Sequence, residues 1–240
     1  MKKFSSLTIF FPTLNDAKIL PYLIKRAYEA ARLVTDDFEI VVINDGSTDD
    51  TTEVIKKLQK KYKNLRLVEH AKTLGYGAAL QSGFASARKA FVFYTDGDGQ
   101  YDPQELADLA KKMTDDVDVV NGYKRVRHDE FIRRLLGYLY NRLVHGVYRL
   151  PIRDIDCDFR LIRRELLDRF ELTASSGVVC LELILNLDRA GARFVEVPVH
   201  HFPRVHGRSR FFTFRHLWNT FTELSLVFLH ARVGTSRVVS

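Results

Sequence analysis

The chain has 240 residues and a formal net charge of +7, and 46% of its residues are hydrophobic, which suits one large domain with a substantial core. It contains only two cysteines, Cys157 and Cys180, which excludes a disulfide framework and indicates a reducing, cytoplasmic compartment. No apolar run approaches about 18 residues, so we expect no transmembrane helix, and Pro12, Asn15 and Asp16 interrupt the apolar start too early for a signal peptide.

The first half of the sequence alternates between strand and helix patterns. Apolar, β-rich runs predict strands, and apolar residues spaced three and four apart predict amphipathic helices. The predicted strands cover 7–11, 38–45, 65–70, 90–96 and 116–123, and the predicted helices cover 19–34, 51–62, 75–88 and 103–113. This alternation, with strands that are apolar throughout, predicts an α/β fold with a mostly parallel central sheet and helices on both faces.

The second half of the sequence is less regular. Helical spacing predicts helices over 131–150, 178–191 and 211–231, and a strand or bent strand pair is predicted over 193–202. There is no internal repeat and no linker. We therefore expect one domain over 1–210, followed by an amphipathic helical extension over 211–240 that is rich in aromatic and basic residues.

Charge is unevenly spread along the chain. Residues 1–120 are close to balanced, whereas 124–237 is arginine-rich, and a basic half attracts phosphates of a nucleotide, a nucleic acid or a lipid. One acidic run interrupts this half, at Asp154, Asp156 and Asp158. We expect these aspartates to pair with Arg153 or Arg160 rather than to form a second metal site.

Polar side chains follow the predicted strands of the first half. They are Asn15, Asp16, Asn44, Asp45, His70, Asp96, Asp98 and, after the fifth strand begins, Asn121. In a parallel sheet, ligands bind beyond the carboxyl ends of the strands. These residues therefore predict a polar binding edge, and its carboxylates argue against a nucleic-acid partner because they repel a phosphate backbone.

The segment 92–103 runs from an apolar strand into a cluster of carboxylates. Asp96, Asp98 and Asp102 repel one another unless a cation or hydrogen-bond donors neutralise them. Asp102 precedes Pro103 and is typical of a helix N-cap. Asp96 and Asp98 are hard oxygen ligands at a strand end, which favours Mg²⁺ or Mn²⁺ shared with substrate phosphates.

Several stretches resemble the inverting family-2 glycosyltransferases, which have a glycosyltransferase A fold. The resemblance rests on FPTLND (11–16), INDGSTDDT (43–51), LGYGAALQSGFASA (74–87) and YTDGDGQYDP (94–103). Two later stretches, 152–167 and 196–212, are similar to the polyprenyl-phosphate sugar synthases, the branch that includes dolichyl-phosphate mannose synthase. The resemblance covers nearly the whole chain and implies a hexose donor activated as a GDP- or UDP-sugar.

The resemblance also implies roles for individual residues. Those that would bind the nucleotide sugar are Pro12, Asn15, Asp16, Asp45, Gly75, Gly77, Asp96 and Lys124. Asp96, Asp98 and Gln100 would hold the divalent cation. The family usually has glutamate where Asp16 stands.

In the polyprenyl branch, basic residues bind the phosphates of donor and acceptor. The positions that would hold the acceptor phosphate are Arg125, Arg133, Arg204, Ser209 and Arg210, and those assigned to catalysis are Asp98, Arg204 and Arg210. Gly137 stands where this branch often has serine, and GRSR (207–210) stands where it has Gly-x-Ser-Lys. A guanidinium at Arg210 can bind a phosphate with two parallel hydrogen bonds, unlike a lysine.

The acceptor is either a phosphate or a hydroxyl. A phosphate is already ionised at neutral pH and needs cations, whereas a hydroxyl needs a general base. Relatives that use a hydroxyl tend to carry an acidic pair before their late helix, but here Glu182 is the only acid in 174–185. Abundant arginines and few acids favour a polyprenyl phosphate, and the alternative is a saccharide or small-molecule hydroxyl with Glu182 as base.

The C-terminal extension bears on the same choice. An aromatic and basic amphipathic helix over 211–231 is typical of a segment that lies in a membrane interface, which suits a lipid-linked acceptor. The alternatives are a helix packed on the domain and a dimer contact. We expect peripheral association with the cytoplasmic face of a membrane. A nucleotide-sugar sensor without catalysis is a further alternative, which intact Asp96 and Asp98 disfavour.

Overall fold

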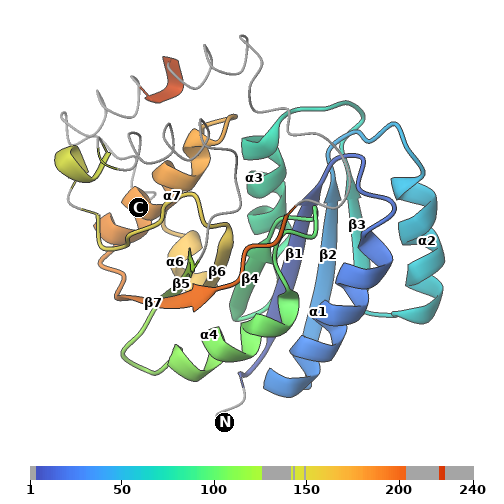
Figure 1. Ribbon diagram of the computed structural model, residues 1–240, viewed down its shortest axis with the longest axis horizontal. Coiled ribbons are helices and arrows are strands. Elements are labelled where there is room, and N and C mark those ends of the chain that lie inside the picture. The colour runs from blue at the N-terminus through green and yellow to red at the C-terminus, as the bar shows by residue number, and fades with distance from the viewer. Residues whose placement is uncertain (1–3, 126–141, 143, 149, 204–221, 225–240) are drawn as a thin grey trace.

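A computed structural model of the protein describes residues 4–125, 142, 144–148, 150–203 and 222–224. Seven strands in this part form one sheet in the order β3-β2-β1-β4-β6-β5-β7 (Figure 1). The strands are β1 (Leu7–Thr13), β2 (Phe38–Asn44), β3 (Leu65–Glu69), β4 (Phe91–Thr95), β5 (Val119–Lys124), β6 (Phe159–Arg163) and β7 (Phe194–Val199). The strands predicted in the first half are all present, with shifted bounds.

Helices cover both faces of the sheet, as predicted. Those described are α1 (Leu20–Val34), α2 (Thr51–Lys61), α3 (Tyr76–Ser86), α4 (Leu106–Lys112), α6 (Arg164–Leu167) and α7 (Val178–Arg189), with a short 3₁₀ helix η1 (Pro103–Glu105) before α4. The helices α1, α2 and α4 pack on one face, and α3 and α7 pack on the other (Figure 1). In the part of the chain that the structure describes, no helix is long and apolar enough to cross a membrane.

Side chains alternate between the two cores along each buried strand. In β1, Ile9 and Phe11 belong to the core on the α1 face, whereas Phe10 belongs to the core on the α3 face. Phe10 stacks on Tyr94 of β4, with 5.3 Å between the ring centroids. Because both faces are covered, the central strands are apolar throughout, which is the pattern seen in the sequence.

The strand β6 was not predicted. It pairs antiparallel with β4 and with β5, while the other pairs, β1 with β2 and β4, β2 with β3, and β5 with β7, are parallel. Its sequence, FRLIR, is short and places two arginines among apolar residues. The sheet is therefore mostly parallel, as expected, with one antiparallel strand inserted next to β4.

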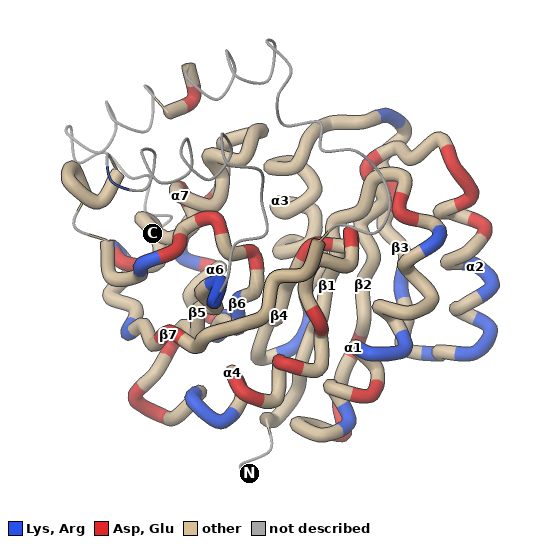
Figure 2. The backbone as a smooth tube through the Cα atoms, in the orientation of Figure 1, with Lys and Arg blue, Asp and Glu red and all other residues tan. Residues whose placement is uncertain are grey.

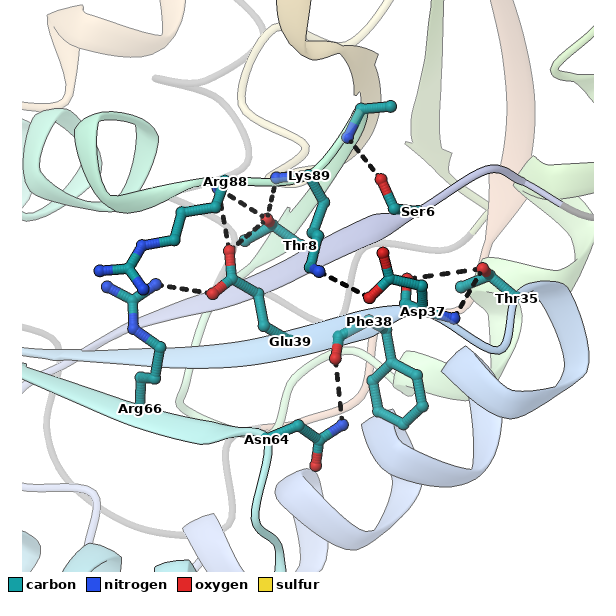
Figure 3. A network of polar contacts seen from close by, with 11 residues as sticks. Ser6, Thr8, Thr35, Asp37, Phe38, Glu39, Asn64, Arg66, Arg88 and Lys89 are labelled. Atoms are coloured by element: carbon teal, nitrogen blue, oxygen red, sulfur yellow. Dashed lines mark hydrogen bonds and ion pairs between the residues drawn. The ribbon is translucent and has the colours of Figure 1, made fainter.

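A network of polar contacts lies at the amino ends of the strands, away from the predicted binding edge (Figure 3). At its centre is Glu39 of β2, which is only 6% exposed. Its carboxylate accepts hydrogen bonds from Thr8 Oγ1 (2.9 Å), Arg88 N (2.9 Å) and an Arg66 guanidinium nitrogen (2.6 Å). Burial alone would raise the pKa of Glu39, but these bonds outweigh burial and the pKa lies below its ordinary value.

Two smaller sequence expectations are also met. Asp102 caps the helical turn that begins at Pro103, because its carboxylate accepts a hydrogen bond from Gln104 N at 3.0 Å. Cys157 and Cys180 are both buried free thiols. The predicted helices over 131–150 and 211–231 lie mostly outside the described residues.

Candidate active site

The candidate site lies at the carboxyl ends of β1, β2 and β4, where acidic stretches gather in the connecting loops (Figure 2). The turn after β4 packs directly on the end of β1, since Gly97 N donates to Pro12 O at 3.1 Å. A Cβ atom at position 97 would lie 2.4 Å from Thr13 Cγ2 and 2.8 Å from Pro12 O. The turn can therefore bring Asp96 and Asp98 this close to β1 only because glycine separates them.

The three predicted metal residues lie in this one turn. Asp96 accepts a hydrogen bond from Tyr76 Oη at 2.7 Å, and Asp98, which is buried, accepts one from Gln100 N at 3.0 Å. The side-chain amide of Gln100 donates to Phe202 O at 3.2 Å, so its amide oxygen is the atom suited to a cation. Two carboxylates and an amide oxygen are a hard-oxygen donor set, which fits Mg²⁺ or Mn²⁺.

Among the residues that the structure describes, no group of three or more His, Cys, Asp or Glu side chains is arranged to hold a metal ion. A pair of carboxylates such as Asp96 and Asp98 is nevertheless the usual protein contribution to a magnesium site that substrate phosphates complete. The donor set therefore fits a cation shared with a ligand, and it does not fit a closed structural metal site.

Asp45 lies at the predicted edge, but the protein itself occupies its carboxylate. Oδ1 lies 2.7 Å from His70 Nδ1 and accepts a hydrogen bond from Leu74 N at 2.9 Å, and Oδ2 accepts one from Gly75 N at 2.9 Å. Asp45 thus joins the end of β2 to the segment that leads into α3. The sequence pattern predicted that Asp45 lies at the site, but it did not predict that Asp45 holds the segment leading into α3 in place.

Asn15 and Asp16 also shape the loops of the edge. Asn15 has a φ of 62°, a left-handed conformation that asparagine tolerates better than most residues. In this conformation the side-chain Oδ1 of Asn15 accepts a hydrogen bond from Thr48 N at 2.8 Å, and the backbone N of Asn15 donates to Ser47 Oγ at 2.9 Å. Asp16 accepts a hydrogen bond from Leu14 N at 3.0 Å. These contacts join the loop after β1 to the loop after β2.

The predicted glycines at the start of α3 have a packing reason. Gly75 has a φ of 108°, and a Cβ atom at Gly77 would lie 2.1 Å from Ala174 O. The loop before α7 crosses the start of α3 at this point, where Gly77 N donates to Ser175 O at 2.9 Å. Only glycine permits two backbone segments to approach so closely.

The structure argues against Glu182 as a general base. One carboxylate oxygen accepts from Thr173 N (3.0 Å) and Thr173 Oγ1 (2.7 Å), and the other from Thr173 N (2.9 Å) and Ala174 N (2.9 Å). Both carboxylate oxygens are therefore engaged by donors of the loop 173–174 and are not directed at a reacting hydroxyl. Glu182 instead holds the loop before α7, a role that the sequence did not predict.

Comparison with known proteins decides the family. The sequence profile described as "Glycosyl transferase family 2" matches residues 8–170. The chain belongs to glycosyl transferase family 2. It is a glycosyltransferase that depends on a nucleotide sugar, and the expected enzyme class is confirmed.

The fold of this glycosyltransferase is similar to solved structures of glucosyl-3-phosphoglycerate synthase from Mycobacterium tuberculosis. The complex of that enzyme with Mn²⁺, uridine diphosphate and phosphoglyceric acid matches with a TM-score of 0.70 at 18% identity, covering 95% of this chain and 78% of that one. The complex with Mn²⁺, UDP-glucose and phosphoglyceric acid matches with a TM-score of 0.70 at 19% identity, covering 95% and 80%. At this identity the likeness shows the fold alone, which confirms the glycosyltransferase A type.

Two of the predicted phosphate-binding basic residues, Lys124 and Arg125, lie at the end of β5, which is separated from β4 by β6 in the sheet. Lys124 ends β5, and its Nζ donates to Asp156 O at 2.8 Å. Arg125 follows it and is exposed. Beside them, Lys124 N donates to Asp154 Oδ2 at 3.4 Å, so one member of the acidic run contacts the backbone at the end of β5.

Arg160 of β6 is fully buried. Its guanidinium lies 3.3 Å from Asp158 Oδ1 and donates to Asn121 Oδ1 at 2.5 Å. It also donates to Tyr94 Oη and to Ile155 O. The expected pairing of the acidic run with Arg160 is therefore confirmed for Asp158, whereas Arg153 pairs with Glu196 at 3.2 Å.

The remaining predicted site residues lie outside the described part of the chain. They are Arg133, Gly137, Arg204, Ser209 and Arg210. The described chain does reach the residue before Arg204, and there Phe202 contacts the turn that follows β4. Phe202 N donates to Gln100 O at 2.8 Å, opposite the bond from the Gln100 side chain to Phe202 O.

Proposed function

We propose that this glycosyltransferase transfers a hexose from a nucleotide diphosphosugar to the phosphate of a polyprenyl phosphate, with inversion at the anomeric carbon. It would belong to the polyprenyl-phosphate sugar synthase branch of the family and would work at the surface of a membrane. The catalytic domain would span 1–210, and the extension over 211–240 would provide the membrane contact.

The donor side of the proposal rests on the turn after β4. Asp96 and Asp98, with Gln100, would hold Mg²⁺ or Mn²⁺, and the related fold of the mycobacterial synthase was solved with Mn²⁺ and uridine diphosphate. A bound cation would neutralise the charge that develops on the departing nucleoside diphosphate. Lys124 would add a second positive charge on the sheet side of the diphosphate.

The nucleotide would lie over the carboxyl ends of β1 and β2. Pro12, Asn15 and Asp16 follow β1, and Asp45 holds the segment that carries Gly75 and Gly77. These residues would shape the pocket for base and ribose through the loops that they order. Asp45 would contribute to nucleotide binding partly by holding the segment before α3 in place, because three groups of the protein already contact its carboxylate.

The observation that carries the choice of acceptor is the occupied carboxylate of Glu182. Thr173 and Ala174 use both of its oxygens, so the one acid of 174–185 is not placed to deprotonate a hydroxyl. A phosphate nucleophile needs no base, and it needs cations to bind it. The acceptor phosphate would be held by the arginines Arg125, Arg133, Arg204 and Arg210 and by the hydroxyl of Ser209.

The contact between Phe202 and Gln100 supports a role for the basic segment in the same site. Phe202 exchanges two hydrogen bonds with Gln100, and Arg204 comes two residues later in the sequence. Residues 204–210 contain three arginines and one serine. Arg204 and Arg210 would place the acceptor phosphate in line with the bond that breaks.

A donor and acceptor screen tests the proposal. The enzyme is incubated with Mn²⁺, each of several UDP- and GDP-hexoses, and either a short polyprenyl phosphate or phosphoglyceric acid, and products are identified by mass spectrometry. The proposal requires a hexosyl lipid phosphate that forms with one donor and disappears when EDTA is added. Transfer to phosphoglyceric acid alone would replace it by the second candidate, a hydroxyl acceptor that carries a phosphate.

A further inference from the structure

Two glutamates hold the loop 173–176, which precedes α7, and they come from distant parts of the chain. Glu182 belongs to α7 itself, whereas Glu223 belongs to the described C-terminal residues 222–224. Glu223 Oε1 accepts from Ser175 N (3.0 Å) and Ser175 Oγ (2.6 Å), and its Oε2 accepts from Ser176 N (3.0 Å) and Ser176 Oγ (2.6 Å). Each carboxylate oxygen thus takes the amide and the hydroxyl of one serine.

The apolar neighbour of Glu223 supports the same docking. Leu224 packs against the core on the α3 face of the sheet. The contact is therefore both apolar and charge-assisted, and it spans 47 and 48 positions of the sequence. Hydrogen bonds to a charged group are among the stronger ones in proteins, so residues 222–224 fix the loop in one arrangement.

The loop in turn contacts the start of α3. Ser175 O accepts from Gly77 N at 2.9 Å, and Ala174 O accepts from the Gln81 side chain at 3.0 Å. The absence of a side chain at Gly77 lets the two backbones touch. Because of this close packing, a displacement of Ser175 displaces the first turn of α3.

The start of α3 contacts both Asp45 and Asp96, the two carboxylates that we assign to the nucleotide-sugar side of the site. Tyr76 Oη donates to Asp96, and Gly75 N donates to Asp45. Hydrogen bonds therefore link Glu223 to Ser175, Ser175 to Gly77, and the adjoining residues Tyr76 and Gly75 to the two aspartates. The peptide backbone of residues 75–77 connects these hydrogen bonds.

We infer that Glu223 is a positioning residue, which holds the loop 173–176 and the start of α3 so that Asp45 and Asp96 are placed for the nucleotide sugar. The inference rests on the proposed function for the identity of the ligand. Glu223 is not placed to act as a general base, because Ser175 and Ser176 use both of its oxygens. Burial alone would raise the pKa of Glu223, but the bonds from Ser175 and Ser176 outweigh burial and lower it.

Hydrogen exchange combined with nucleotide binding tests the inference. The variant Glu223→Gln replaces one acceptor oxygen by an amide NH₂ that faces donors, and Glu171→Gln makes the same change at an exposed site near the loop. A double variant, Ser175→Ala with Ser176→Ala, removes two donors and leaves Glu223 in place. Exchange is followed by mass spectrometry in the full-length enzyme, and binding of UDP and GDP with Mn²⁺ is followed by calorimetry.

We expect Glu223→Gln to speed exchange of the Ser175 and Ser176 amides by roughly 10- to 100-fold. The Gly77 amide should also exchange faster, and the Kd for the preferred nucleotide should rise about fivefold or more. The double serine variant should change both quantities in the same direction, and Glu171→Gln should change neither. Exchange in β1 should stay as in the wild type, which a general loss of stability would not allow.

Two results would overturn the inference while leaving the proposed function intact. One is unchanged exchange at Ser175 and Ser176 in Glu223→Gln. The other is faster exchange there with an unchanged Kd for both nucleotides. If the wild-type enzyme binds neither nucleotide with Mn²⁺, the proposed function itself fails, and this is known before any variant is compared.

Discussion

His70 Nδ1 lies 2.7 Å from Asp45 Oδ1, and both side chains are almost fully buried, at 8% and 5% exposure. The other ring nitrogen of His70 lies 2.8 Å from Ser82 Oγ in α3. Asp45 also accepts from the amides of Leu74 and Gly75. The pair therefore joins the ends of β2 and β3 to α3, and the nucleotide side of the proposed pocket depends on it.

The variant Asp45→Asn keeps the shape of the side chain but turns one oxygen into a donor that faces other donors. Loss of one charge-assisted hydrogen bond should weaken nucleotide binding by roughly ten- to hundredfold, while binding still requires Mn²⁺. Calorimetry with UDP and GDP measures this, with Asp188→Asn at an exposed position of α7 as the control. An unchanged Kd for both nucleotides would remove Asp45 from the site.

The variant Asp98→Asn should abolish turnover, because it removes one negative ligand of the proposed cation. The backbone bond from Gln100 N can persist on the amide oxygen, so we expect the fold and its melting temperature to be retained. Loss of preorganised charge stabilisation of this kind lowers kcat by about 10²- to 10³-fold or more. If the variant stays active in the presence of EDTA, a divalent cation is not part of the reaction.

The variant Glu39→Gln should be less stable than the wild type at pH 7 and equally stable in acid. The folded-state pKa of Glu39 is lowered, so its stabilisation is fully present above the ordinary glutamate pKa and is lost as the pH falls through the folded-state value. We expect a difference in unfolding free energy of about 1.5–3 kcal/mol at pH 7, from the loss of a charged hydrogen-bonded group. Urea titrations at several pH values measure it, with Glu171→Gln as the control. A difference that grows as the pH falls would contradict the assigned role of Arg66 and Arg88.

The variant Arg160→Met should destabilise the fold strongly. It leaves the buried Asp158 without its cation, and removal of one partner from a buried ion pair costs about 3–5 kcal/mol. Arg164→Met is the matched control, because Arg164 pairs with Asp168 at the surface, where such pairs contribute about 0–1 kcal/mol. Similar midpoints of urea unfolding for the two variants would show that Arg160 has no special structural role.

Sequence reasoning located the edge of the site because that edge follows from strand order and polarity. Five apolar strands alternate with helices, and such strands are parallel, so the polar residues after them must share one side of the sheet. The turn from Asp96 to Gln100 was found for this reason. The antiparallel strand β6 was missed, because Phe159–Arg163 reads as a short segment between acids and arginines, and only its position between β4 and β5 makes it a strand.

Contacts between distant segments could not be read from the sequence. Glu182 is a lone acid in an apolar helix, and the pattern alone does not tell whether it faces a cleft or a loop. The contact of Glu223 with Ser175 and Ser176 joins residues 47 and 48 positions apart, and no local pattern marks either partner. Both contacts depend on how α3, α7 and the C-terminal residues pack, which composition and spacing do not specify.

The last prediction separates the two classes of acceptor. A true general base contributes about 10²- to 10⁴-fold to the rate, so Glu182→Gln would be nearly inactive if a hydroxyl were the acceptor. We expect the variant to keep most of its kcat and to lose thermal stability, because its carboxylate holds Thr173 and Ala174. Arg204→Ala and Arg210→Ala should instead raise the KM for polyprenyl phosphate or lower kcat by roughly 10- to 100-fold, as expected for lost charge-assisted bonds to a phosphate. Nucleotide binding should change little in both.

Steady-state kinetics with varied donor and varied acceptor measure these effects, and calorimetry with the nucleotide alone gives the donor affinity. Exposed Arg189 in α7 supplies a control, because Arg189→Ala removes the same charge from the opposite end of the helix that carries Glu182. An inactive Glu182→Gln beside active arginine variants would require a base-dependent hydroxyl acceptor and a rearranged loop 173–176. Inactive arginine variants beside an active Glu182→Gln would identify an ionised phosphate as the nucleophile. The reaction would then need cations to bind the acceptor and no side chain to accept a proton.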